Sequence, residues 1–180
     1  MYCLDTDNEC CKMNYKDYIK EVQDFPVEGV NFKDISPLLG NQKVFNKALD
    51  DMFCLVEDVP DYWVGIDARG FIFASALSAK FGGGILLCRK EGKLPPPTIN
   101  YKYNTEYSVD TLEIKEGKGS VIIVDDVLAT GGTLQAVNDM SLLAGYSILD
   151  NIVLIDLDYV PKVNWYSTNT RSLIKYESVR

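Results

Sequence analysis

One segment of the chain combines residue types that could bind an anionic ligand. Residues 121–133 read VIIVDDVLATGGT: four β-branched residues, then two acids, then a Thr-Gly-Gly-Thr turn. Gly131 and Gly132 would let backbone N–H groups converge on an anion, because no Cβ stands in the way. The helix that follows would add its positive dipole end. The hydroxyls of Thr130 and Thr133 would add further donors, so the segment predicts a cup for a phosphate monoester.

Two adjacent acids, Asp125 and Asp126, come directly before this predicted cup. Their charge would repel a bare phosphate. Carboxylates do accept hydrogen bonds from vicinal hydroxyls, and they favour a cationic ribosyl centre. A solvated acidic turn would explain one aspartate, but two at the end of a buried strand need a reason. The combination therefore favours a sugar phosphate over free phosphate or a nucleoside triphosphate.

Other phosphate motifs are incomplete. Gly92 and Lys93 are followed by Leu94, so they do not form a P-loop. Gly117 and Gly119 lack the third glycine of a dinucleotide fingerprint, since position 122 is isoleucine.

Composition excludes several classes of function. The net charge of -8 and the pI near 4.6 argue against a nucleic-acid binder, which needs a basic face. With no histidine among the 180 residues, Ser-His-Asp catalysis and His-ligated zinc are excluded. The five cysteines include no C-x-x-C pair, no secretory signal precedes them, and no apolar run is long enough for a membrane span. We expect one domain in the cytoplasm.

The elements that would position the predicted cup alternate between strands and helices. We expect strands at 63–66, 85–88, 112–114, 121–124 and 152–157, and helices at 43–57, 70–81 and 133–144. Apolar residues at helical spacing from Tyr15 to Val22 predict a further helix, and residues 89–107 are expected to form a long loop with a strand-like end. This order predicts an α/β fold with a parallel sheet and helices on both faces, in which ligands bind at the carboxyl ends of the strands.

Five blocks in order resemble type I phosphoribosyltransferases and, within them, the adenine phosphoribosyltransferase family. They are DFPVEGVNFKDI (24–35), GIDARGF (65–71), RKEGKLP (89–95), TEY (105–107) and the 121–133 string. The resemblance implies the fold of that family, with a small base-binding hood at 14–36 and a flexible catalytic loop. Residues 1–13 are polar and irregular, so we expect them to form a poorly ordered leader. Residues 14–180 would then form one domain.

The resemblance also implies roles for residues outside the cup. The ligand 5-phosphoribosyl 1-pyrophosphate, or the product AMP, would contact Asp125, Asp126, Ala129, Thr130, Gly131, Gly132, Thr133, Arg69, Arg89, Lys90, Lys93 and Tyr107. Glu106 would be the acid–base residue. Mg²⁺ would be held mainly by the substrate diphosphate, with no direct protein ligand. The Arg89 position reaches the neighbouring subunit's site in the family, which implies a homodimer.

By the same resemblance, Val30, Asn31, Phe32 and Lys33 would bind adenine, with Phe32 stacking on the base. The expected reaction joins adenine to 5-phosphoribosyl 1-pyrophosphate and releases AMP and pyrophosphate. Three features depart from the family pattern: Lys33 replaces the commoner arginine, three prolines stand at 95–97, and residues 158–170 diverge.

Three alternatives remain open at this point. A transferase for xanthine, guanine or hypoxanthine would differ in the groups that read the base. A non-catalytic sensor of phosphoribosyl pyrophosphate is disfavoured by the acidic charge and by Glu106. A ribose-phosphate pyrophosphokinase would require a nucleotide site and a longer chain.

Overall fold

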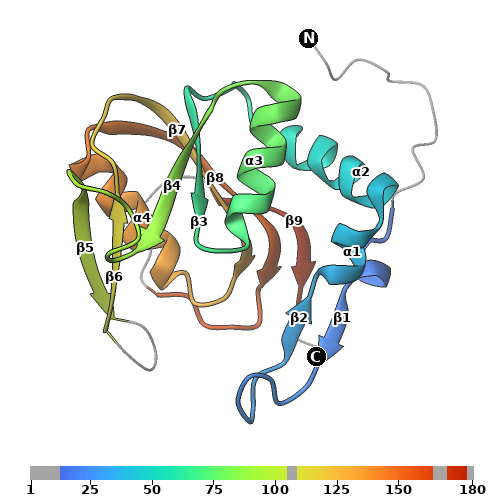
Figure 1. Cartoon of the computed structure of the whole chain (residues 1–180). Helices are drawn as coiled ribbons and strands as arrows, with labels where there is room; N and C mark the ends of the chain where they lie inside the picture. Colours follow the sequence, from blue (N-terminus) through green and yellow to red (C-terminus); the bar gives the residue numbers. More distant parts are fainter. Residues whose placement is uncertain (1–12, 105–108, 164–169, 178–180) are drawn as a thin grey trace. The chain divides into compact units, whose positions relative to one another are not determined.

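The computed structural model describes residues 13–104, 109–163 and 170–177 (Figure 1). The chain forms two compact units, Met1–Cys54 and Leu55–Arg180. The predicted leader lies outside the described residues except for Met13. No helix among the described residues is long and apolar enough to cross a membrane.

The first unit contains a short antiparallel strand pair and three short helical segments. A 3₁₀ helix, η1 (Tyr15–Tyr18), precedes β1 (Lys20–Val22), which pairs with β2 (Phe32–Asp34). Helix α1 (Ser36–Gly40) and helix α2 (Gln42–Phe53) follow. Asn41 caps α2 because its side-chain oxygen accepts a hydrogen bond from the Val44 N–H at 3.3 Å.

Two sequence predictions for this unit are wrong in part. The helix expected from Tyr15 to Val22 stops at Tyr18, because the next residues pair with β2, ten positions or more downstream. The apolar spacing is nevertheless real, since Tyr15 and Ile19 are both buried. The helix expected at 43–57 ends at Phe53.

The second unit is built on a seven-stranded sheet in the order β5-β6-β4-β3-β7-β8-β9 (Figure 1). Its strands are β3 (Tyr62–Ile66), β4 (Gly84–Lys90), β5 (Ile99–Asn104), β6 (Val109–Ile114), β7 (Gly119–Leu128), β8 (Tyr146–Leu157) and β9 (Thr170–Tyr176). The strands β4, β3, β7, β8 and β9 are parallel, whereas β5 and β6 form an antiparallel edge. The predicted parallel α/β sheet is confirmed.

Two helices cover opposite faces of this sheet. Val64 and Ile66 of β3 share a buried cluster with Val137 and Met140 of α4 (Gly132–Leu143). Gly65 points to the other face, where a Cβ would meet Ala74 of α3 (Gly70–Phe81) at 3.0 Å. Successive residues of a strand face opposite ways, so the two helices sandwich the sheet.

Several strands are longer than the sequence suggested. The run at 121–124 is part of β7, which continues to Leu128, so both aspartates lie within the strand and not after it. Pairing with β8 causes this extension, because Val127 lies opposite Ile155 and Leu128 opposite Asp156. The expected loop at 89–107 contains the whole of β5, and β9 was not predicted.

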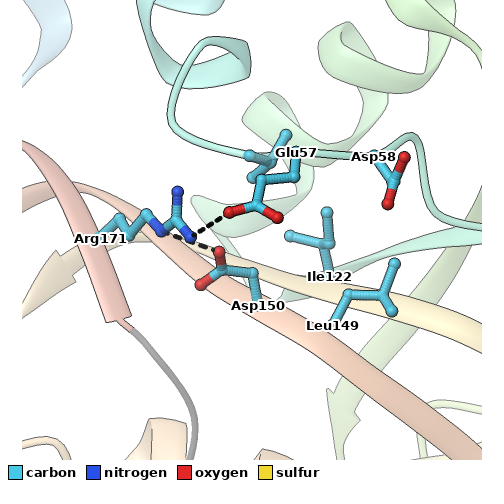
Figure 2. Close-up of a pocket in the computed structure, with 7 residues that line it drawn as sticks. Glu57, Asp58, Ile122, Leu149, Asp150 and Arg171 are labelled. Atoms are coloured by element: carbon cyan, nitrogen blue, oxygen red, sulfur yellow. Dashed lines mark ion pairs between the residues drawn. The ribbon is translucent and has the colours of Figure 1, made fainter.

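At the amino ends of the parallel strands, Arg171 of β9 joins β8 to the segment before β3 (Figure 2). Its Nε lies 3.0 Å from Asp150 Oδ2 and its Nη2 lies 3.5 Å from Glu57 Oε1. Arg171 also donates through Nη1 to the Leu55 carbonyl. These contacts border a small pocket at the end of the sheet opposite to the predicted cup. We interpret them as an anchor for the edge strand.

Candidate functional site

A pocket lies where the sequence predicts the phosphate cup. It is lined by residues 127–134, together with Asp125 of β7 and Val153 of β8. Gly131 adopts the left-handed conformation, with φ of 87°, immediately before α4 begins at Gly132. That turn requires glycine, because a side chain would be strained at this φ. The pocket therefore combines a glycine turn with the amino terminus of a twelve-residue helix.

The two aspartates beside this pocket carry perturbed carboxyl groups. Burial raises the pKa of Asp125 well above its ordinary value, and the charge of Asp126 raises it further. Burial also raises the pKa of Asp126, although Arg69 opposes the shift. Asp126 is 4% exposed. Buried acids with raised pKa values at a pocket are typical of a functional site rather than of a solvated turn.

Arg69 lies next to these acids. It precedes α3, and its Nε lies 2.8 Å from Asp126 Oδ2. Gly70 lets this loop approach β7 closely, since a Cβ there would meet the Val124 carbonyl oxygen at 2.6 Å. The structure thus brings together the end of β7 and the turn between β3 and α3 that carries Arg69.

The predicted basic cluster is only partly connected to this loop. Arg89 Nε lies 3.4 Å from Asp67 Oδ2, and its guanidinium lies 5.9 Å from the centre of the Phe71 ring. Lys90 is instead exposed, with its ammonium 3.9 Å from Asp110 Oδ2. Lys93 donates its backbone N–H to Glu113 Oε1 at 2.6 Å. Neither lysine lines the pocket beside Asp125.

The predicted base-binding residues lie on one turn and strand of the first unit. Phe32 packs edge-to-face against Phe25, with 5.1 Å between ring centres. Lys33 is buried, and its ammonium lies 2.7 Å from Glu21 Oε2. Asn31 donates to the same carboxylate oxygen at 2.7 Å. These hydrogen bonds, that from Lys33 first, lower the pKa of Glu21.

Val30 closes the turn that precedes β2. Its N–H donates to the Val27 carbonyl and its carbonyl accepts from the Phe25 N–H. A carbonyl oxygen has a second lone pair, so Val30 retains one backbone acceptor for a ligand.

Sequence reasoning missed Lys162, which lies in the segment that departs from the family pattern. The Lys162 ammonium contacts the Ala129 carbonyl, 33 residues earlier, at 2.8 Å. No local pattern could have indicated it. The predicted residues Glu106 and Tyr107 lie outside the described residues. In the described part of the chain, no group of three or more cysteine or acidic side chains is placed to hold a metal ion.

Comparison with known proteins decides between the families that this geometry allows. The model of the phosphoribosyl transferase domain matches residues 44–156. An adenine phosphoribosyltransferase of Bdellovibrio bacteriovorus is 44% identical over 165 residues, which cover 91% of this chain and 100% of that relative. The chain belongs to the adenine phosphoribosyltransferase family. A family member from Mycoplasmopsis pulmonis is 41% identical, with 91% of this chain and 98% of the relative covered.

Solved structures of adenine phosphoribosyltransferases confirm the predicted family and fold class. The Saccharomyces cerevisiae enzyme, complexed with an imino-altritol bisphosphate and adenine, has a TM-score of 0.84 at 30% identity and covers 90% of this chain and 97% of its own. The Giardia lamblia enzyme, complexed with 9-deazaadenine, has a TM-score of 0.83 at 31% identity and covers 91% of this chain and 96% of its own.

Proposed function

We propose that this chain transfers the phosphoribosyl group of 5-phosphoribosyl 1-pyrophosphate to N9 of adenine, forming AMP and pyrophosphate. The observation that carries the proposal is the pocket in which the half-buried Asp125, next to the buried Asp126, adjoins a glycine turn and a helix amino terminus. Neither part alone suits this ligand, whereas the two together match a ribose with a 5′-phosphate. Membership of the adenine phosphoribosyltransferase family supplies the base.

Different residues around the pocket would bind different parts of the substrate. The backbone N–H groups of 129–133 and the hydroxyls of Thr130 and Thr133 would bind the 5′-phosphate. Asp125 and Asp126, when ionised, would accept hydrogen bonds from the ribose hydroxyls and stabilise positive charge at C1′. Arg69 would leave Asp126 for the departing diphosphate, since the same guanidinium can bind either anion.

The bond from C1′ to the diphosphate oxygen breaks as N9 of adenine forms its bond to the opposite face of C1′. Adenine loses its N9 proton, and Glu106 would accept it. Positioning of the two reactants and charge stabilisation at both ends would supply most of the rate enhancement.

The base would meet residues of the first unit. Phe32 would stack on adenine, and the backbone at Val30 and Asn31 would read its edge. Lys33 would position this turn through Glu21, because its ammonium is already bound there at 2.7 Å.

Magnesium fits this site as a substrate-bound ion. Asp125 and Asp126 favour a cationic neighbour, because a positive charge nearby would offset the desolvation that raises their pKa values. When bound, Mg²⁺ neutralises diphosphate charge. We propose that the substrate's diphosphate and ribose hydroxyls, together with water, supply its ligands, since Mg²⁺ keeps much of its water and binds few side chains directly.

A homodimer is a further part of the proposal. Ile72 of α3 and Ile85 and Leu87 of β4 are apolar yet 38–42% exposed. Ile85 and Leu87 lie on the same strand as Arg89, whose family position reaches the neighbouring subunit. A second copy of the chain covering these side chains would remove apolar area from water. We also propose a cytoplasmic location, which the free thiol of the buried Cys88 supports.

The test is incubation with adenine, 5-phosphoribosyl 1-pyrophosphate and Mg²⁺, with AMP and pyrophosphate measured together. Hypoxanthine, guanine and xanthine are assayed in parallel. We expect equimolar AMP and pyrophosphate, with adenine favoured by at least about 100-fold in kcat/KM, because mismatched groups at a base edge leave polar atoms unpaired. Ligand binding without product would support a sensor, and preference for a 6-oxo base would overturn the adenine assignment.

Glu106→Leu tests the acid–base role. We expect kcat to fall by about 100-fold or more, because general acid–base catalysis contributes about 10²–10⁴. The Kd for ribose 5-phosphate should change little, since that ligand has no base. Glu116→Leu, at an exposed position after β6, is the matched control. Equal losses in kcat and in ribose 5-phosphate affinity would exclude the role.

A further inference from the structure

Lys162 makes three contacts that tie two separate parts of the second unit together. Its Nζ donates to the Leu157 carbonyl at 2.7 Å and to the Ala129 carbonyl at 2.8 Å. It also lies 2.8 Å from Asp156 Oδ1. Two of its three donors form hydrogen bonds to these carbonyls, and the ion pair with Asp156 holds the ammonium beside them. Lys162 therefore joins the carboxyl end of β8 to the turn that follows β7.

A backbone contact beside Lys162 strengthens the same connection. The Val163 N–H donates to the Thr130 carbonyl at 2.9 Å. Two successive carbonyls of the pocket turn, those of Ala129 and Thr130, are thus held by residues 162 and 163.

Holding these carbonyls fixes the opposite ends of their peptide units. In a trans peptide the N–H points away from the C=O of the same unit. The Lys162 contact at Ala129 O therefore sets the direction of the Thr130 N–H, and the Val163 contact at Thr130 O sets that of the Gly131 N–H. Thr130 and Gly131 both line the pocket. These are the donors that an oxyanion in the pocket would meet.

The charge of Lys162 is balanced by Asp156, whose side chain is 13% exposed. The ammonium therefore contributes orientation more than net charge. Because the ammonium lies on the carbonyl side of the peptide unit, it also favours the orientation in which the N–H end of that peptide dipole points to an anion in the pocket.

We infer that Lys162 is a positioning residue for the phosphate-binding turn, holding the Thr130 N–H toward the 5′-phosphate of the substrate. This role rests on the proposed function of the pocket. The 158–170 segment, which departs from the family pattern in sequence, would thus supply a support for the turn from outside the 121–133 string.

The test compares two ligands that share a phosphate but meet different parts of the site. Lys162→Met removes the ammonium and keeps a side chain of similar length. We expect the Kd for ribose 5-phosphate and the KM for 5-phosphoribosyl 1-pyrophosphate to rise about tenfold, the scale of one hydrogen bond to a charged group. The Kd for pyrophosphate and kcat at saturation should change less than about twofold, because neither depends on the 5′-phosphate turn.

Three further variants keep the test decisive. Lys162→Gln retains neutral N–H donors and should recover ribose 5-phosphate affinity to within about threefold of the original chain. If Lys162→Met does not fold, Lys162→Ala, which also lacks the ammonium, carries the test with the same selective loss expected. Lys175→Met, at an exposed position on β9, is the matched control and should leave both affinities unchanged.

The outcomes separate this inference from the proposed function. Equal weakening of ribose 5-phosphate and pyrophosphate in Lys162→Met, or no weakening of either, would overturn the positioning role even if the original chain forms AMP. If the original chain binds ribose 5-phosphate without forming AMP, the proposed function fails, and selective weakening in the variant still supports Lys162.

Discussion

Asp125 and Asp126 are adjacent acids in a place with little solvent. Asp125 Oδ1 accepts the Asp126 N–H at 2.9 Å, and Arg69 lies 2.8 Å from Asp126. Even so, burial raises the pKa of both carboxyls. The ligand-free protein thus holds two groups whose charged forms are disfavoured, in a position where a cationic ribosyl centre would favour them.

Asp125→Asn should separate stability from function. Burial raises the native pKa of Asp125 above its unfolded value of about 3.9. The protonated carboxyl therefore makes its full contribution to the free energy of unfolding at pH values below about 3.9. The contribution is lost as pH rises through the raised native pKa. At neutral pH we therefore expect Asp125→Asn to increase the free energy of unfolding of the ligand-free protein by about 1 kcal/mol, while ribose 5-phosphate binds at least about tenfold more weakly. Thermal unfolding from pH 4 to pH 8 and calorimetry measure the two effects.

Asp58→Asn is the control, because Asp58 is exposed at the opposite end of the sheet. Its unfolding curve should follow that of the original chain across the pH range. A less stable Asp125→Asn protein at pH 7 would show that the carboxylate stabilises the ligand-free fold.

Single residues differ in how far the sequence could reveal them. Asp125, Asp126 and the glycine turn were predictable because strand, acids and turn are contiguous, and their order has a chemical meaning. Lys162 was not, because its partner Ala129 is fixed by the pairing of β7 with β8. A lysine that touches a distant carbonyl leaves no periodic trace in the sequence.

At the scale of elements, α3 and β7 meet more closely than any residue with a Cβ would allow. Gly70 opens α3, and a Cβ there would lie 2.6 Å from the Val124 carbonyl oxygen and 3.3 Å from Asp125 Oδ1. The helix start, the strand and the buried acid therefore share one narrow contact. Any displacement of α3 here would also displace Arg69.

Gly70→Ala should destabilise the protein and impair the site together. Alanine favours a helix over glycine by about 1 kcal/mol, whereas overpacking costs about 1–3 kcal/mol. The clash is with backbone, which yields little, so we expect a net loss of about 1–2 kcal/mol in chemical denaturation and at least about tenfold lower kcat/KM. At Gly40 a Cβ would meet nothing within 4 Å. Gly40→Ala should lie within about 0.5 kcal/mol of the original chain, and a similarly small effect of Gly70→Ala would contradict the close approach.

Helices and strands could be predicted where the local hydrophobic pattern and the contacts with other elements favour the same structure. The strand at 63–66 and the helix at 70–81 were found almost to the residue, since the strand is a continuous apolar run and glycines at 82–84 mark the end of the helix. The failures involve distant pairing: residues 20–22 became a strand by pairing with 32–34, and β7 was extended by β8. In β9 the alternation of apolar and polar residues is weak, and this segment forms a strand because it pairs in parallel with β8.

At the scale of the whole molecule, the exposed apolar residues of α3 and β4 bear on assembly. Leu86 and Cys88 of β4 are buried in the core shared with α4, while Ile85 and Leu87 face the opposite way. The alternation of β4 would normally place polar residues on a solvent-facing side. Apolar residues there favour contact with another chain.

Leu87→Glu should disrupt a homodimer formed through this face. Burying an unpaired carboxylate at an interface is costly, so we expect the Kd for self-association to rise at least about 100-fold. Analytical ultracentrifugation across a concentration series measures it. Leu143→Glu is the control, because Leu143 is 66% exposed at the end of α4. If Leu87→Glu and the original chain sediment alike, this face does not form the dimer.

The central place of β3 has a consequence for synthesis on the ribosome. β3 ends at Ile66 and gains one neighbour soon after it is made, when β4 follows at Gly84. Its other neighbour, β7, begins only at Gly119. At about 5–20 residues per second, one edge of this apolar strand stays open for roughly 3–10 s. An open edge next to Trp63 and Val64 can pair with another nascent chain. Translation speed between residues 66 and 119 should therefore influence how much of the protein escapes aggregation.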